Sequence, residues 1–156
     1  MKTYLTHPSD TKLTSGVFYS DSDDYKKAID YKNINEFQSL SHKDLLIYLI
    51  PSSLVSTYPF KENKKLSHQN NLAKFISEVD TNLVKDVSKN KFFLINNIGY
   101  VIEKSVYEQL SESLSSLKCK VILLPDYFLN QKINADSVTE FNNKILFAFS
   151  DGTGTS

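Results

Sequence analysis

The sequence predicts an α/β domain in which helices flank a mixed β-sheet. Two runs, residues 45–50 and 121–124, are apolar on both faces, and each is stopped by a proline. Such runs are typical of interior strands that are covered on both sides. Between them, residues 72–83 place apolar side chains at the spacing of one helical stripe. This alternation of strands and helices favours the α/β class.

The N-terminal segment predicts a hairpin followed by a short connector. Residues 2–6 and 16–19 have the composition of strands, and the turn-forming stretch 8–10 separates them. Residues 21–24 bring three acidic side chains together, as a calcium loop does. An EF-hand loop also needs a glycine at its sixth position and a glutamate at its twelfth, and this chain has lysine at both. We therefore expect a turn there, and a short helix or extended connector at 34–40.

The central segment predicts a strand, a helix and a hairpin. Residues 55–60 alternate loosely and predict a strand, and Ser67 is the expected N-cap of the helix that follows. The helix carries one apolar stripe, which we expect to face the core rather than a cofactor: Leu72, Phe75, Ile76, Val79 and Leu83. Two apolar runs, 91–95 and 100–103, surround an Asn/Gly turn and predict a β-hairpin.

The C-terminal segment predicts a second helix, a strand and a terminal strand. Ser105 and Glu108 have the spacing of a capping box. The buried side of that helix is expected to carry Val106, Leu110, Leu114 and Leu117. After the second apolar run, Asp126 is placed to cap one helical turn. Residues 130–137 are polar and predict a linker, and residues 145–149 predict the last strand.

Composition and charge argue against a nucleic-acid partner. Lysine and arginine together number 18, and so do the acidic residues, so the formal net charge is zero. Every one of the basic residues is lysine. The absence of arginine removes the planar donor fork that favours phosphate and guanine contacts. We therefore expect no binding to nucleic acid.

Cysteine and histidine usage predicts neither a disulfide nor a metal site. The single cysteine, Cys119, lies in an apolar stretch, where we expect a buried and inert thiol. The three histidines have no partner at zinc-ligand spacing. No apolar run approaches the roughly 20 residues of a membrane-spanning helix, and the N-terminus lacks the apolar core of a signal peptide. We therefore expect a cytoplasmic protein.

One segment has the composition of a phosphate-binding motif. A strand leads into a Gly/Thr-rich turn, which is how backbone N–H groups are brought to a phosphate. The residues of this turn are Asp151, Gly152, Thr153, Gly154 and Thr155. The lysine-containing Walker pattern is absent, which weakens this interpretation, and a flexible tail is the alternative. No nucleophile elbow or cysteine–histidine arrangement is present either. The residues predict a protein that is not an enzyme, and we expect no cofactor.

Several segments, in order along the chain, resemble one known family. The sharpest is 121–126, a strand that ends Leu-Leu-Pro-Asp. A strand that ends Pro-Ser lies at 45–53, and a long helix that runs into an acidic stretch lies at 66–86. A strand that leads into a helix lies at 100–117, and a strand with a Gly-containing turn lies at 145–154. Together they resemble the cytoplasmic region of the L protein of the type II secretion system, the GspL family, and more distantly the pilus assembly protein PilM.

The resemblance implies a particular domain organisation. Residues 1–54 with 104–137 would form a partial actin-like, ribonuclease-H-like lobe, and residues 55–103 a small β-α-β-β insert. Residues 138–156 would begin a second lobe or form a tail. In the family such a region precedes a membrane helix and a periplasmic domain. Contact with the membrane is therefore expected only through a segment that follows this sequence, with the domain on the cytoplasmic face of the inner membrane.

The resemblance also implies a function without catalysis. The domain would dock the N-terminal domain of the secretion ATPase, a GspE-like protein, onto the other proteins of the inner-membrane platform. Actin-like ATPases place a spacer between the acid and the glycine of their phosphate turns, whereas Asp151 here precedes Gly152 directly. The alternative is a PilM-like, actin-fold pilus assembly protein that binds nucleotide at 151–155. An unrelated α/β domain is the third possibility.

Two aromatic residues are candidates for contact with a partner protein. Tyr127 and Phe128 directly follow the strand that ends at Pro125. The centres of protein interfaces are enriched in aromatic side chains, so we expect these two residues to contribute to docking. The alternative is that both rings cap the hydrophobic core.

Overall fold

The computed structural model has the predicted α/β class with a mixed sheet. It describes residues 1–9, 12–130, 132, 135–141 and 144–155. The chain folds as two compact units, Met1–Pro51 with Glu108–Asp126 and Ser52–Tyr107 with Tyr127–Ser156. The division into lobe, insert and tail that the sequence resemblance implies stays a prediction.

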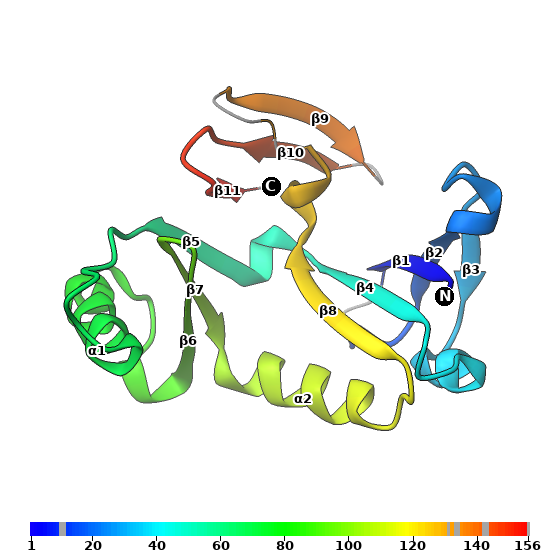
Figure 1. Ribbon diagram of the computed structural model, residues 1–156, viewed down its shortest axis with the longest axis horizontal. Coiled ribbons are helices and arrows are strands. Elements are labelled where there is room, and N and C mark those ends of the chain that lie inside the picture. Colours follow the sequence, from blue (N-terminus) through cyan, green and yellow to red (C-terminus); the bar gives the residue numbers. More distant parts are fainter. Residues whose placement is uncertain (10–11, 131, 133–134, 142–143, 156) are drawn as a thin grey trace. The chain divides into compact units, whose positions relative to one another are not determined.

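The first unit is built on a five-stranded mixed sheet (Figure 1). Its strands are β1 Thr3–Pro8, β2 Gly16–Ser20, β3 Ile29–Tyr31, β4 Leu45–Ile50 and β8 Lys120–Pro125. The order is β3-β2-β1-β4-β8, in which β1, β2 and β3 are antiparallel while β4 is parallel to both β1 and β8. The predicted N-terminal hairpin is confirmed; Asp10 of its predicted turn lies outside the described residues.

The predicted interior position is confirmed for β4 and wrong for β8. Strand β4 lies between β1 and β8, with Leu46, Tyr48 and Leu49 almost fully buried. Among the described residues, β8 is an edge strand of this sheet, at the opposite side from β3. A run that is apolar on both faces of a strand indicates that both faces are covered by other elements. It does not report whether a second strand pairs along its other side.

Short 3-10 helices connect the strands of the first unit. They are η1 Asp21–Asp23, at the predicted turn, and η2 Ile34–Ser39, where a short helix or connector was expected. A capping box between Asn33 and Glu36 starts η2. The ring of Phe37 packs edge-on against Phe18 and Tyr31, with centroid distances of 5.3 Å and 5.2 Å. These aromatic contacts cover one face of the sheet beside β1 and β2.

The second unit contains a β-α-β-β arrangement. Its elements are β5 Val55–Pro59, α1 His68–Val79, β6 Asn90–Ile95 and β7 Ile98–Glu103, with 3-10 turns η3 Ser52–Leu54, η4 Asp80–Asn82 and η5 Val87–Lys89. The antiparallel sheet has the order β5-β7-β6. Ser67 caps α1 as predicted, since its Oγ accepts a hydrogen bond from the N–H of Asn70 at 3.2 Å. The predicted hairpin turns at Asn96 and Asn97, both with positive φ, as two-residue hairpins require.

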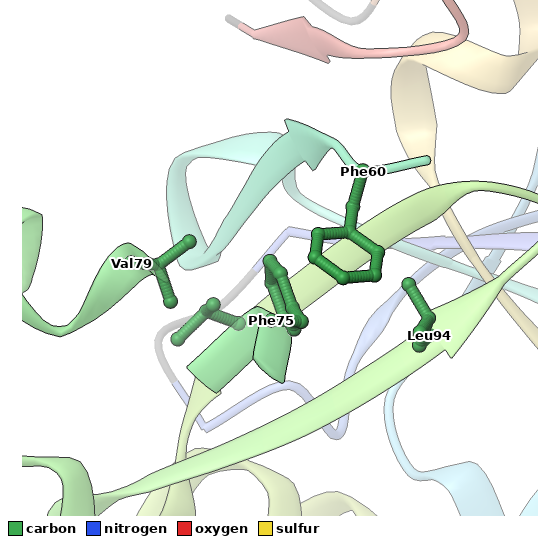
Figure 2. Close-up of a cluster of buried hydrophobic side chains, with 5 residues drawn as sticks. Phe60, Phe75, Val79 and Leu94 are labelled. Carbon is green, nitrogen blue, oxygen red and sulfur yellow. The ribbon is translucent and has the colours of Figure 1, made fainter. Parts of the chain in front are cut away.

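A hydrophobic cluster joins α1 to this sheet. Figure 2 shows Phe75 of α1 between Phe60, Val79 and Leu94, and Val101 completes the buried set. The predicted stripe therefore faces the core, although α1 ends at Val79 and Leu83 reaches the cluster from the segment beyond it.

The helix α2 Lys104–Ser115 begins two residues earlier than it would if Ser105 were its N-cap. Ser105 lies inside the helix, and its hydroxyl donates to Glu103 Oε1 at 2.7 Å instead of capping the backbone. The expected buried side is nevertheless present, because Leu110 and Leu114 are buried and Leu117 is half-buried.

The C-terminal segment forms a second antiparallel sheet, of which the sequence predicted one strand. A 3-10 turn, η6 Asp126–Asn130, is followed by β9 Ser137–Phe141, β10 Lys144–Ala148 and β11 Gly154–Thr155 in the order β11-β10-β9. Figure 1 shows β9 and β10 side by side, as their pairing requires. The predicted linker, 130–137, lies partly outside the described residues, and its last residue, Ser137, begins β9.

Candidate protein-binding surface

The C-terminal sheet has one buried face and one exposed apolar face. Leu146 and Ala148 of β10 are buried against Tyr127, while the residues that alternate with them point the other way. Four apolar side chains on or beside β9 and β10 are between 38% and 63% exposed: Val138, Ile145, Phe147 and Phe149. Exposed apolar residues gathered on one face, rather than scattered singly, mark an interaction surface.

The structure places Tyr127 in the core of this sheet. Its side chain is 0% exposed and packs against Leu146 and Ala148. Its hydroxyl donates to the carbonyl oxygen of Gly152 at 3.1 Å. The ring of Phe128 stacks on it at 5.2 Å and is half-buried. This burial favours the alternative that Tyr127 caps the core, whereas Phe128 keeps accessible surface. A role for either in docking stays a prediction.

The Gly/Thr-rich turn uses its polar groups within the second unit. The N–H of Thr153 and its hydroxyl both donate to Asp151 Oδ1, at 2.9 and 2.6 Å. The N–H of Gly152 donates to the carbonyl of Phe149, and the N–H of Gly154 donates to Thr57 Oγ1 at 3.2 Å. Thr155 pairs with β10, so the turn leads into a strand rather than a tail. A phosphate would have to displace these bonds and approach the Asp151 carboxylate, so this geometry does not favour the phosphate site.

A shallow groove of about 240 Å³ lies elsewhere in the second unit. Residues of β5, β6 and β7 line it, together with the segment after α1, where Val84 is fully exposed. In the groove Lys85 Nζ lies 2.6 Å from Glu103 Oε2. The hydrogen bonds from Lys85 and then Ser105 hold the pKa of the Glu103 carboxyl below its ordinary value. A carboxylate with a lowered pKa is a poor general base near neutrality.

The first unit contains a buried histidine–aspartate pair that the sequence did not predict. His7 Nε2 lies 3.4 Å from Asp126 Oδ2, and both residues are almost fully enclosed. They meet because His7 is near the carboxyl end of β1 and Asp126 follows β8, and β4 aligns both strands in parallel. Parallel strands bring their carboxyl ends to one edge of the sheet. A pair so enclosed does not reach a substrate, and we assign it a structural role.

Three further features of the described residues concern the cysteine, possible metal ligands and the length of the helices. Cys119 is buried as expected, and this burial raises the pKa of its thiol. Within the described ranges, His, Cys, Asp and Glu side chains do not gather into groups of three or more that could hold a metal ion. None of the helices in that part of the chain combines the length and apolar character needed to cross a bilayer.

The fold and its surfaces define an α/β protein whose C-terminal sheet has an exposed apolar face. Comparison of the structure with solved proteins finds similarity to the cytoplasmic domain of EpsL, an inner membrane component of the type II secretion system of Vibrio cholerae. The similarity covers 99% of this chain and 70% of that chain, with a TM-score of 0.71 and 11% sequence identity. At this identity it establishes the fold, and the predicted resemblance is confirmed at that level.

A second solved structure gives a weaker match. It is a Bacteroides thetaiotaomicron protein with an actin-like ATPase fold and unknown function, matched over 97% of this chain and 67% of that chain. The TM-score is 0.41 and the sequence identity 11%. Comparisons of the sequence with models of protein families and with curated proteins find no match.

Proposed function

We propose that this chain is a non-catalytic scaffold of a type II secretion inner-membrane platform and that it recruits the secretion ATPase. The observation that carries the proposal is the similarity of fold, along 99% of the chain, to the cytoplasmic domain of an inner-membrane component of that system. The sequence resemblance through residues 121–126 points to the same family. On this basis the partners are the N-terminal domain of a GspE-like ATPase and the other platform proteins, on the cytoplasmic face of the inner membrane.

The chemistry of the described surfaces supports binding rather than turnover. Phosphoryl transfer depends on cations positioned around the phosphates. The turn at 151–155 instead presents the carboxylate of Asp151 and uses three of its N–H groups internally. The His7–Asp126 pair is enclosed and does not reach a substrate. The exposed apolar face of the β9–β11 sheet is the kind of surface that protein interfaces bury.

The first test of the proposal is direct binding. The purified domain is expected to bind the isolated N-terminal domain of the cognate secretion ATPase with a single class of sites, measured by isothermal titration calorimetry. The ATPase without that domain is the control and should give no saturable heat. Two folded proteins that show no saturable binding at about 100 μM, the weak end of specific association, would contradict the recruiting role.

The second test separates the scaffold from the PilM-like alternative. A ligand at 100 times its Kd stabilises a protein by about 2.7 kcal/mol, which for a domain of this size raises Tm by about 5–10 °C. We expect Mg-ATP to leave Tm unchanged and the domain to release no phosphate. A clear rise in Tm that Asp151→Ala removes would establish the nucleotide-binding alternative. ATP turnover that the same substitution abolishes would overturn the scaffold role itself.

A further inference from the structure

We propose that the exposed apolar face of the β9–β11 sheet binds one amphipathic helix of a protein partner, and that basic side chains flank the apolar stripe of that helix. The inference deepens the proposed function and rests on it for the identity of the partner, the N-terminal domain of the secretion ATPase. The chemistry of the face is argued from the sheet alone.

The apolar face is continuous across the two longer strands. Val138 of β9 pairs directly with Phe147 of β10, and Glu140 pairs with Ile145. Side chains that stand opposite each other on one face lie about 5 Å apart and touch. The buried face is already filled by Tyr127, so the exposed side chains have no place in that core. Burial of this face against a partner removes apolar surface from water, which is favourable.

The size of the face fits one helix and is too small for a stable dimer. Three strands spaced by about 4.8 Å span about 10 Å, and a strand of five residues is about 17 Å long. A helix with its side chains is about 10 Å wide, and about 11 residues of it cover 17 Å. A stable interface between two copies buries about 800 Å² on each partner, several times the area of this face. A single docked helix is therefore the better occupant.

The charges on and beside the face are negative. Glu140 stands among the apolar side chains, and Asp136 and Asp151 are exposed at the end where β9 begins and β10 ends. Residues 127–155 contain two lysines. Lys144 lies on the side of β10 opposite to the exposed apolar face, and Lys132 precedes the sheet. Complementary charges steer association and fix its register. Lysine or arginine beside the apolar stripe of the partner helix supplies that complement.

The experiment uses a pair of matched variants. Ile145→Asp places a charge in the middle of the face, and Ile95→Asp does the same at the end of β6, outside the face. Both isoleucines are 56% exposed, so the two substitutions disturb folding to a similar degree. Circular dichroism and thermal unfolding establish that each variant is folded before binding is measured. Glu140→Lys replaces the acidic side chain that stands among the apolar ones, while Asp136 and Asp151 stay acidic, and tests the electrostatic part of binding.

Two probes separate the chemistry of the face from the identity of the partner. The first is a pair of fluorescently labelled 18-residue amphipathic helical peptides, one of leucine and lysine and one of leucine and glutamate, followed by anisotropy. We expect the lysine peptide to bind wild type and Ile95→Asp, and to bind Ile145→Asp at least tenfold more weakly. Glu140→Lys should weaken binding of the lysine peptide and reduce its advantage over the glutamate peptide. The second probe is the N-terminal domain of the ATPase, with the same order among the variants.

Each outcome decides one of the two claims. Failure of wild type to bind either peptide, or equal binding by Ile145→Asp, overturns the helix-binding face. Peptide binding as expected without any ATPase binding leaves the face standing and removes the proposed partner. ATPase binding that is insensitive to Ile145→Asp keeps the scaffold role and overturns this face as its site. If the domain sediments as a dimer and Ile145→Asp dissociates it, a second copy occupies the face and the proposal is overturned. If a longer chain that contains this sequence does not bind the peptide, another segment of that chain occupies the face, and the proposal is likewise overturned.

Discussion

Replacement of Phe75 by alanine is expected to lower the free energy of unfolding by about 3–5 kcal/mol, the range for removal of a buried aromatic ring. The side chain is 0% exposed and lies at the centre of the cluster that joins α1 to the β5-β7-β6 sheet. Its ring packs edge-on against Phe60 at 5.5 Å and Phe92 at 6.3 Å. The substitution therefore removes apolar burial and leaves a cavity that three strands and one helix cannot close without moving.

Urea denaturation followed by circular dichroism measures this loss. Lys74→Ala, an exposed change on the same helix, is the control and should alter stability only within about 0.5 kcal/mol. A loss below about 1 kcal/mol for Phe75→Ala would contradict the core assignment and make the stripe of α1 a candidate partner groove. An unchanged dependence of the free energy on urea in both variants would show that stability alone was altered.

The sequence predicted those parts of the fold that local pattern determines. A helix stripe and a two-residue turn are set by spacing and by residue type, which is why α1, its Ser67 cap and the hairpin around Asn96 and Asn97 are confirmed. The sequence placed Gly99 in that turn, but it lies in β7, where glycine is needed because the strand packs closely against α1. A Cβ there would be 2.1 Å from the ring of Phe75. Such close approach between distant residues leaves no mark in the local pattern.

The order of strands and the contents of the core could not be read in the same way. Strand β8 has the composition of an interior strand, yet it lies at an edge, because sheet order depends on contacts far apart in the sequence. Strand β9 was missed because its two large apolar residues, Val138 and Phe141, are three positions apart and give no period-two alternation. The His7–Asp126 pair joins residues 119 positions apart, and only the parallel alignment of three strands brings them together.

The candidate site shows the same limit of local reasoning. Tyr127 and Phe128 were chosen because they are aromatic and follow a strand end, and that pattern does not distinguish an exposed ring from a buried one. The apolar run at 145–149 was present in the sequence and predicted a strand. Only the second strand beside it, and the burial of Leu146 and Ala148 beneath, reveal that Ile145 and Phe147 lie on a face open to solvent.

Tyr127→Ala is accordingly expected to lower the free energy of unfolding by about 3–5 kcal/mol, since it removes a fully buried ring from the centre of the C-terminal sheet. Tyr127→Phe keeps the ring and removes the hydroxyl that donates to Gly152, a loss of about 1 kcal/mol. Gly154 packs so closely on this ring that a Cβ there would lie 2.3 Å from it. Urea denaturation of the two variants measures both values.

This prediction determines how docking by Phe128 must be tested. A double variant, Tyr127→Ala with Phe128→Ala, would lose ATPase binding through damage to the sheet, whether or not either ring touches the partner. Phe128→Ala alone keeps the Tyr127 core and removes a half-buried ring, so a loss of binding with the fold intact would assign Phe128 to the contact. If the free energy of unfolding of Tyr127→Ala instead lies within about 1 kcal/mol of that of wild type, the assignment of Tyr127 to the core of the C-terminal sheet is wrong. The apolar face would then lose the rigid support on which helix docking depends.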